Sequence, residues 1–375
     1  MKILCYSSYF LPYISGITTT TSRILNHLGK KNQVTLLTFQ HDQKLKKEET
    51  MGKIWVLRMP WNLRISKGFI SLSSISYFMQ QAGSCNAVII NLPNVEGLPL
   101  AIIAKLLRKK LIVLFHCDVV LSGGIFPFIV TQVARFSAFL QLLLSDVIVA
   151  YPDYLDEHWY AEFFKDKLKI TLPLFSKAAV DVKYRNQLLK HKGRKKWVGF
   201  VGRIASEKGV EYLIEACLRL KKKKVSFELV FAGPEAVGEK EYRAKMISLL
   251  KNNKIPHRLL GMVSERQLAT LYETLDVVVI PSINQTEAIS IVQLEAMAAG
   301  TPVVATSMPG VRYPIRQTGM GVQVEPKSPQ KLASAINNVL NNKKHYVNDE
   351  SKGKLKAFIS SKDILKFYTE LFKTS

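Results

Sequence analysis

The sequence is poor in cysteine and in acidic residues, and both shortages exclude classes of protein. The four cysteines form no C-x-x-C pair and lie far apart, at Cys5, Cys85, Cys117 and Cys217. Neither a disulfide framework nor a cysteine-based zinc site is therefore predicted. The longest apolar stretch, residues 125–144, is interrupted by polar side chains, so we predict no membrane-spanning segment. The chain also has no internal repeat and no low-complexity tract.

Acidic residues are the scarcer charged class. The chain has 29 Asp and Glu against 53 Lys and Arg, which gives a formal net charge of +24. Positive charge is spread along the chain rather than gathered in a tail, and it favours an anionic partner. Membrane headgroups, a lipid-linked diphosphate and nucleic acid all qualify. Because no recognition-helix pattern and no basic motif with interleaved aromatics is present, we expect no nucleic acid.

The length and the apolar content predict two domains rather than one. The chain has 375 residues, of which 47% are hydrophobic, enough for two cores. Strand-like and helical segments alternate in both halves, and this pattern predicts doubly wound parallel sheets with helices on both faces. We predict a first domain over residues 1–175, a polar and basic linker over 176–196, and a second domain over 197–345.

In the first half, polar residues follow predicted strands at the edge where such sheets bind ligands. Ser15 and Gly16 lie in the loop after the strand Lys2–Tyr6, and His116 and Asp118 follow the strand at 111–115. A histidine at a strand end can hydrogen-bond a ligand hydroxyl. The alternatives are a half-buried histidine with protein partners, an Asp118 that caps a turn, and a simple turn at Gly16.

In the second half, residues 277–305 predict a buried strand, a loop, a helix and another buried strand. Ser290 followed by Gln293 matches a capping box, so the helix is predicted to begin at Ser290. The first amides of this helix, including those of Ile291 and Val292, would face the loop and stabilise an anion.

Two glutamates flank that helix start, Glu287 in the loop and Glu295 within the helix. A phosphate ester that carries hydroxyl groups suits such an arrangement, and a nucleotide sugar is one. The alternative is that both glutamates are caps or solvated surface residues.

A second charged motif follows the strand predicted at 197–201. Gly202 permits a tight exit from the strand, and Arg203 and Lys208 place two cations at the start of the next helix. Cations there oppose the helix dipole, so an anion between them is the functional interpretation. The alternative is an ordinary surface ion pair with Glu207.

Taken together, these motifs resemble glycosyltransferase family 4. The stretch PSINQTEAISIVQLEAMAAGTPVVA is similar to the family's E-x7-E region, and the G-R-x-x-x-x-K-G pattern is similar to its diphosphate clamp. The resemblance implies a GT-B fold, with two facing Rossmann-like domains and an interdomain cleft. It also implies that the last helix, within 360–375, packs back on the first domain. Ser15 and Ser290 stand where the family has glycines.

The resemblance further implies transfer of a sugar, with retention of configuration, from a nucleotide diphosphate sugar to a hydroxyl acceptor. Arg203, Lys208, Glu287 and His116 would be catalytic; Gly16, Gly202, Ser290, Ile291, Val292 and Glu295 would bind the donor, and Ser15 and Asp118 the acceptor. No D-x-D motif occurs, so neither a metal ion nor any other cofactor is expected.

We expect the acceptor to be a lipid-linked or cell-envelope glycan. The protein would be cytoplasmic, and the basic surface with the helix near 126–144 suggests docking at the inner face of an anionic membrane. Two other functions stay open at this point: a sugar-nucleotide epimerase of the same fold, and a non-catalytic partner of a transferase.

Overall fold

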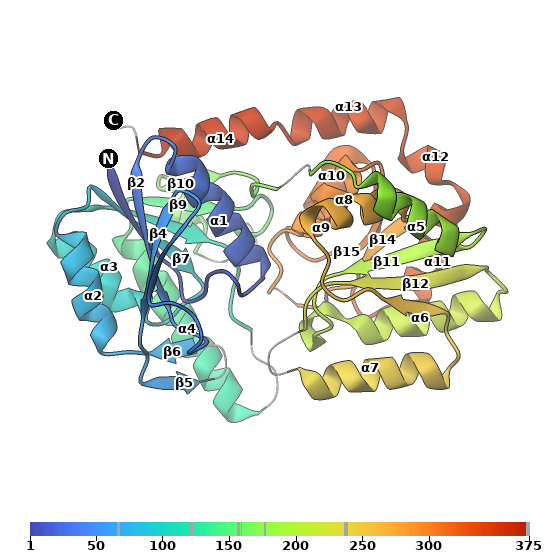
Figure 1. The fold of residues 1–375 in the computed structure, drawn as a ribbon, viewed down its shortest axis with the longest axis horizontal. Helices are drawn as coiled ribbons and strands as arrows, with labels where there is room; N and C mark the ends of the chain where they lie inside the picture. The colour runs from blue at the N-terminus through green and yellow to red at the C-terminus, as the bar shows by residue number, and fades with distance from the viewer. Residues whose placement is uncertain are drawn as a thin grey trace. The chain divides into compact units, whose positions relative to one another are not determined.

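The structure, a computed structural model, describes residues 1–65, 68–120, 124–155, 158, 160–175, 178–235, 239–284 and 286–372. The chain divides into two compact units (Figure 1). Unit 1 comprises Met1–Leu174 and Ser361–Ser375, and unit 2 comprises Phe175–Ser360. The C-terminal segment thus belongs to the same unit as the N-terminus.

Unit 1 is built on a sheet whose described strands have the order β10-β9-β8-β7-β1-β2-β4-β3. All neighbours are parallel except β3, which pairs antiparallel with β4. The chain leaves β1 for β2 on one side and later returns to β7 on the other, so the switch point lies between β1 and β7. The strands are β1 (Lys2–Tyr6), β2 (Gln33–Phe39), β3 (Glu48–Met51), β4 (Ile54–Met59), β7 (Ala87–Leu92), β8 (Lys110–Phe115), β9 (Val147–Ala150) and β10 (Leu168–Ile170).

Helices pack in two groups in unit 1. The first and last helices of the unit, α1 and α14, contact each other, while α2, α3 and α4 pack in succession. A short hairpin of β5 (Leu63–Ile65) and β6 (Gly68–Ile70) is separate from the main sheet. The helices are α1 (Gly16–Leu28), α2 (Ser73–Ala82), α3 (Gly97–Leu106), α4 (Ile125–Leu144), the 3₁₀ turn η2 (Glu162–Phe164) and α14 (Ser361–Glu370).

Unit 2 has a parallel sheet whose described strands have the order β13-β12-β11-β14-β15-β16. The chain runs from β11 outward through β12 and β13, then returns to β14 on the other side of β11. The switch point of this sheet therefore lies between β11 and β14. The strands are β11 (Lys196–Val201), β12 (Phe227–Ala232), β13 (His257–Leu259), β14 (Val277–Ile280), β15 (Val303–Thr306) and β16 (Gly321–Val324).

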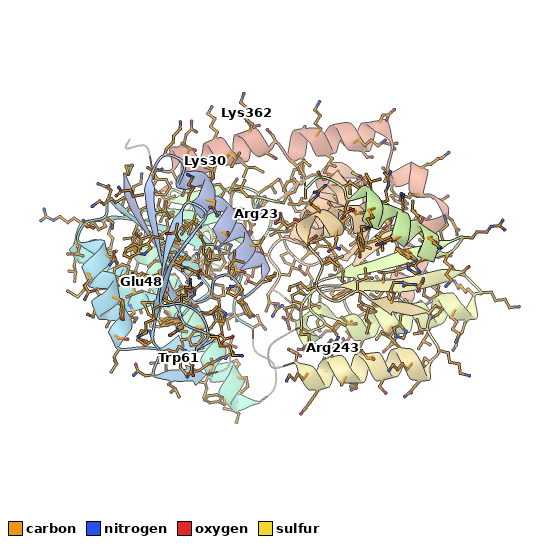
Figure 2. All side chains as sticks on the ribbon, in the orientation of Figure 1. Arg23, Lys30, Glu48, Trp61, Arg243 and Lys362 are labelled. Carbon is orange, nitrogen blue, oxygen red and sulfur yellow. The ribbon has the colours of Figure 1, made fainter. Side chains whose placement is uncertain are left out.

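The sheet of unit 2 is buried because helices cover both of its faces. On one face α6 contacts α7 and α11, and on the other α8 contacts α5 and α9. Figure 2 shows Arg243 on α7 of this unit and Trp61 on unit 1. The helices are α5 (Val182–Lys192), η3 (Ser206–Lys208), α6 (Val210–Lys222), α7 (Lys240–Asn252), α8 (Glu265–Thr274), α9 (Ile291–Ala298), α10 (Tyr313–Thr318), α11 (Pro329–Asn341), α12 (Lys343–Tyr346) and α13 (Asp349–Phe358).

The stretch expected to be a linker, residues 176–196, is not all connection. Ser176 and Lys177 lie outside the described residues, but α5 occupies much of the rest and packs against α8. Asp181 caps α5 by accepting a hydrogen bond from the Tyr184 amide at 3.0 Å. Leu188 is the buried residue of α5, so its apolar face is too narrow to show in the sequence pattern.

One described helix, α4, is long and apolar enough to cross a membrane, by length and composition only. Only a third of its most apolar window is buried within the protein. The expectation of no spanning segment rests on the polar residues of this helix, of which Thr131, Ser137 and Gln141 are buried.

Candidate functional site

The strongest cluster of sequence-predicted residues lies in unit 2, where β11 and β14 end at the switch point. The turn η3 carries Lys208, and Gly209 after it adopts a left-handed backbone with φ +63°. A Cβ at Gly209 would lie 2.3 Å from the carbonyl oxygen of Pro281, just past β14. Gly209 therefore permits the close approach that places Lys208 beside the β14 loop.

Lys208 and Glu287 form an ion pair across these two loops. The Lys208 Nζ lies 3.2 Å from Glu287 Oε1, and the Ser282 hydroxyl donates to Glu287 Oε2. Burial alone would raise the pKa of Glu287. The charge of Lys208, together with hydrogen bonds from Ser282, Lys208 and Ser290, outweighs burial and lowers that pKa below its ordinary value. Glu287 is therefore a carboxylate held ionised in a mostly buried position.

Arg203 lies in the same loop region and pairs with Glu207. Its Nη2 is 3.2 Å from Glu207 Oε1, and both side chains are largely buried. The surface ion pair considered as the alternative is thus present, although it is not on the open surface. Both cations of the motif have carboxylate partners here, so an incoming anion would have to compete with Glu207 and Glu287 for them.

The helix α9 begins at the predicted residue but with different contacts. Ser290 is the residue before the first turn, yet its side chain makes no capping hydrogen bond. Its hydroxyl instead contributes to lowering the pKa of Glu287. The Gln293 side chain donates to the Val311 carbonyl at 2.8 Å, and the Gln293 amide bonds to Ser290 O. The capping box is therefore wrong.

The remaining first-turn amides of α9 belong to Ile291 and Val292. Amides at this position have no carbonyl one turn earlier in the helix to accept their hydrogens. They lie directly after the Glu287 loop, so the helix start still provides two donors for an anion.

Glu295 lies one turn further into α9. Its Oε2 accepts a hydrogen bond from the Tyr272 hydroxyl of α8 at 3.2 Å. The side chain is only partly buried, so part of the carboxylate is accessible. Tyr272 itself is buried, and no sequence motif marked it as a partner of Glu295.

The loop that holds Glu287 is braced by a second glycine that sequence reasoning missed. Gly310 has φ +72°, and a Cβ there would lie 1.5 Å from the Ala288 carbonyl oxygen. No side chain fits at this contact. The sequence offers only a Pro-Gly pair here, which predicts a turn and not the close contact with Ala288.

In unit 1, Ser15 has a clear local role. Its side chain accepts from the Thr18 amide at 3.2 Å, and the Thr18 hydroxyl accepts from the Ser15 amide at 2.9 Å, which completes a capping box for α1. Gly16 is the first residue of α1, and a Cβ there would meet no heavy atom within 4 Å. Neither residue has a described contact that requires a ligand.

His116 is a buried histidine with protein partners at both ring nitrogens. Nδ1 lies 2.8 Å from the Tyr151 hydroxyl and Nε2 lies 2.9 Å from Asn91 Oδ1. Burial lowers the pKa of His116 to about 4, so the ring is neutral at physiological pH. These two bonds match the alternative interpretation, in which the histidine has protein partners. A contact of His116 with sugar hydroxyls stays a prediction, and it requires the ring to exchange one of these bonds for a bond to the sugar.

Asp118 is also buried and pairs with His158, whose Nε2 lies 2.7 Å from Asp118 Oδ2. The Asp118 amide donates to the Tyr154 hydroxyl at 2.7 Å. The side chain thus connects the loop after β8 to the segment after β9.

A further group at the switch point of unit 1 was missed by sequence reasoning. Glu96 Oε1 accepts hydrogen bonds from the Tyr6 hydroxyl at 2.9 Å and the Ser8 hydroxyl at 2.5 Å, and Glu96 Oε2 accepts one from the Val95 amide at 3.0 Å. The contacts with Tyr6 and Ser8 join residues about ninety positions apart, so no local pattern could have found them.

No group of three or more His, Cys, Asp or Glu that could hold a metal ion is found in the described part of the chain.

Two doubly wound units with parallel sheets define the GT-B class of fold. A comparison of structures agrees: HepE from Anabaena, crystallised with UDP and glucose, superposes with a TM-score of 0.79 over 100% of both chains at 18% identity. At that identity the likeness shows the fold alone.

Within this class, residues 183–356 match the family model described as glycosyl transferases group 1. This range covers most of unit 2 and includes Arg203, Lys208, Glu287 and Glu295. Membership of glycosyltransferase family 4 in particular stays a prediction.

Curated relatives match over a similar length. An uncharacterized glycosyltransferase of Methanocaldococcus jannaschii is 37% identical over 162 residues, which is 42% of this chain and 40% of that protein. A D-inositol 3-phosphate glycosyltransferase of Corynebacterium urealyticum is 32% identical over 151 residues, 39% of this chain and 35% of that protein. The chain thus spans less than half the length of these relatives.

Proposed function

We propose that the protein is a glycosyltransferase that moves a sugar from a nucleotide diphosphate sugar to a hydroxyl acceptor. The observation that carries this proposal is the Lys208–Glu287 ion pair at the switch point of unit 2, 3.2 Å apart and next to the start of α9. The site brings cations, a buried carboxylate and helix amides together, and it falls within the range matched by the glycosyl transferases group 1 model.

Charge develops on the leaving nucleoside diphosphate as the bond to the sugar breaks. Arg203 and Lys208 are the cations placed to stabilise it, together with the amides of Ile291 and Val292. Each such donor contributes roughly 2–4 kcal/mol to lowering the barrier in a site without water. In this proposal Lys208 exchanges Glu287 for a phosphate oxygen when the donor binds.

When Lys208 binds a phosphate oxygen instead of Glu287, the Glu287 carboxylate can bind another group. With Lys208 engaged by phosphate, the Glu287 carboxylate, still held by Ser282, is available to orient hydroxyls of the transferred sugar. Glu295, partly accessible one turn inside α9, is placed to accept hydrogen bonds from ribose hydroxyls. Gly202 at the end of β11 permits close approach of the phosphates, with φ +142°.

The finer features of the proposal are retention of the anomeric configuration, no required metal ion, and a lipid-linked or cell-envelope glycan as acceptor. Unit 1 would bind that acceptor through the neighbourhoods of Ser15, His116 and Asp118. The cytoplasmic location, with attachment at the inner membrane face, belongs to the same proposal. UDP in the similar HepE structure supports starting with UDP-sugars.

The test of the donor site is a thermal-shift panel of nucleotide diphosphate sugars, beginning with UDP-glucose, on the wild type and three variants. Arg203→Ala and Glu295→Ala each remove a proposed donor contact. Lys354→Ala is the matched control, because it also removes a cation paired with a glutamate in unit 2, Glu350 on α13. We expect one sugar nucleotide to stabilise the wild type and the control but neither site variant.

Two further readouts separate the other functions. Conversion of the bound sugar nucleotide to an epimer, with no acceptor added, would support the epimerase. If no sugar nucleotide stabilises any of these proteins, the result would contradict the donor site and favour the non-catalytic partner. Turnover that persists in a chelator such as EDTA supports the metal-independent mechanism, and its loss would refute it.

A further inference from the structure

Helix α4 exposes aromatic side chains and buries polar ones, which is unusual for a helix of a soluble domain. Its buried residues include Thr131, Ser137 and Gln141, which are polar. The rings of Phe126 and Phe136 are instead 64% and 65% exposed. A helix that packs on a core normally buries its aromatics and exposes its hydroxyl and amide groups. At these positions of α4 this order is inverted.

The buried polar side chains are specifically bonded, so the inversion is built into the packing of α4 on unit 1. The Ser137 hydroxyl donates to the Val95 carbonyl at 3.0 Å, and Gln141 Nε2 donates to Asn94 Oδ1 at 3.1 Å. Both partners lie in the loop that leads into α3. Rotating α4 to bury its aromatics would break these bonds and leave polar groups unpaired.

The opposite side of the helix is a largely apolar stripe, which we call the outer face of α4. Most of its members are three, four or seven residues apart, so they lie along one side of the helix, where Gln132 is also exposed. Phe163 of η2 extends the stripe, because its exposed ring lies 6.3 Å from that of Phe139 on α4. The outer face consists of Ile125, Phe126, Ile129, Val133, Phe136 and Leu143, all exposed.

The charged side chains on α4 and at its C-terminal end are positive, whereas the neighbouring turn η2 carries Glu162, which pairs with Lys165 at 2.6 Å. Arg135 is the only charged residue of α4 and is exposed. At the C-terminal end of the helix the Lys167 ammonium donates to the Leu143 carbonyl at 2.8 Å. Asp146, just beyond the helix, is neutralised by Lys105 at 2.6 Å. An apolar stripe edged by cations complements an anionic lipid surface, where headgroups meet the cations and acyl chains meet the stripe.

A second copy of the chain is a poorer occupant of this face. Each copy carries a net charge of +24, so two basic faces would repel each other on approach. A spanning helix is also a poorer fit, because Ser137 and Gln141 hold α4 against unit 1 and would have to be pulled from their partners.

We propose that the outer face of α4 inserts into the interfacial region of an anionic bilayer, with the helix lying in the membrane plane. Phe126, Ile129, Val133 and Phe136 enter the acyl boundary, while Arg135 and Lys167 stay at the headgroups. This inference identifies the docking surface and does not depend on sugar transfer, so it stands or falls separately from the proposed function.

The test is flotation of the full chain with phosphatidylglycerol–phosphatidylcholine vesicles and with pure phosphatidylcholine vesicles. Three proteins are compared: the wild type, the double variant Phe126→Ser/Phe136→Ser, and Met262→Ser. Met262 is the matched control, because it is an apolar side chain of unit 2 that is 67% exposed. All substituted side chains are exposed, so thermal unfolding should be unchanged in each variant.

We expect the wild type and Met262→Ser to float with anionic vesicles and much less with neutral ones. The double variant should partition about tenfold or more weakly, since two phenylalanine side chains no longer leave water. Equal flotation of the double variant and the wild type would overturn the proposal, as would no flotation of the wild type. Resistance of the wild type to alkaline carbonate extraction would indicate a spanning helix. A wild-type dimer that the double variant converts to monomer would assign the face to a second copy.

Discussion

Replacing Lys208 with methionine should destabilise unit 2 in a way that depends on pH. Lys208→Met keeps most of the side-chain volume but removes the charge that faces Glu287 at 3.2 Å. At that separation two unit charges attract by about 5 kcal/mol at an effective dielectric constant of roughly 20. Glu287 keeps the hydroxyl bonds from Ser282 and Ser290, so the loss is partly offset. We expect about 2–3 kcal/mol less stability near neutral pH.

The direction of the pH dependence follows from the two opposing effects on Glu287. In the wild type, Lys208 and the hydroxyls hold the pKa of Glu287 below its ordinary value, so the pair stabilises the protein above the ordinary pKa and loses its effect only as pH falls through the lowered one. In the variant, burial becomes the dominant effect and raises this pKa. Glu287 then takes up a proton under mildly acidic conditions and stops being an unpaired buried charge. The stability difference between wild type and variant should therefore shrink as pH falls.

The assay is urea unfolding followed by the fluorescence of Trp197, which is fully buried in unit 2. Phenylalanine at Trp55, Trp61 and Trp159 leaves Trp197 as the only tryptophan of the chain. Wild type and Lys208→Met are compared near pH 7 and near pH 5, where we expect the difference to fall by at least about 1 kcal/mol.

The matched control is Lys354→Met, which removes the lysine of a solvent-exposed pair with Glu350. Its urea midpoint should not change measurably, because exposed pairs contribute little. A loss in Lys208→Met that is the same at both pH values would refute the reasoning, since it would come from packing rather than from an unpaired carboxylate.

Three further predictions concern residues whose contacts are equally specific. Ser15→Ala should lower stability by about 1 kcal/mol in thermal unfolding, because it removes the cap of α1, while Ser15→Gly should cost only a few tenths; equal losses would contradict a capping role. Gly310→Ala should cost at least about 2 kcal/mol in urea unfolding, since its Cβ meets the Ala288 carbonyl, whereas Gly300→Ala, also at positive φ but with no neighbour within 4 Å, should cost less. Burial lowers the pKa of His116 to about 4, below the unfolded value of about 6.5. Unit 1 should therefore lose stability as pH falls below about 6.5, by about 2 kcal/mol at pH 5. His116→Gln should remove this part of the pH dependence of the unfolding free energy.

The central strands of both sheets could be predicted from the sequence because each is a short apolar run between turn signals. The strand Lys2–Tyr6 has the predicted bounds in the structure, and the strands predicted at 111–115 and 197–201 each begin one residue earlier, at Lys110 and Lys196. Edge elements could not be predicted in this way. The strand β3 (Glu48–Met51) alternates exposed and half-buried residues, and its pairing with β4 rather than its own composition makes it a strand.

In the candidate site, local physics predicted some contacts and missed others, and the functional roles that the resemblance implies stay predictions. Local reasoning left open whether Arg203 pairs with Glu207, and this pair is present. It also predicted a capping box at Ser290, where tertiary contacts took both side chains: Gln293 bonds to Val311 and Ser290 faces Glu287. Contacts of this kind join loops that are distant in sequence, so periodicity and capping rules could not have found them.

Ser15 and Ser290 stand where the resemblance to glycosyltransferase family 4 leads us to expect glycines, and this bears on whether the site is intact. A glycine is required only where φ is positive or where a Cβ would meet another atom. Ser15 has φ −148° and Ser290 has φ −85°, both ordinary for a residue with a side chain. Neither position therefore carries backbone strain that only glycine could relieve. The glycines that the packing does require, Gly209 and Gly310, lie at the loops that hold Lys208 and Glu287. Serine at positions 15 and 290 is thus weak support for a degenerate, non-catalytic site, and the loops that these glycines permit keep a cation and a carboxylate 3.2 Å apart, as the proposed donor site requires.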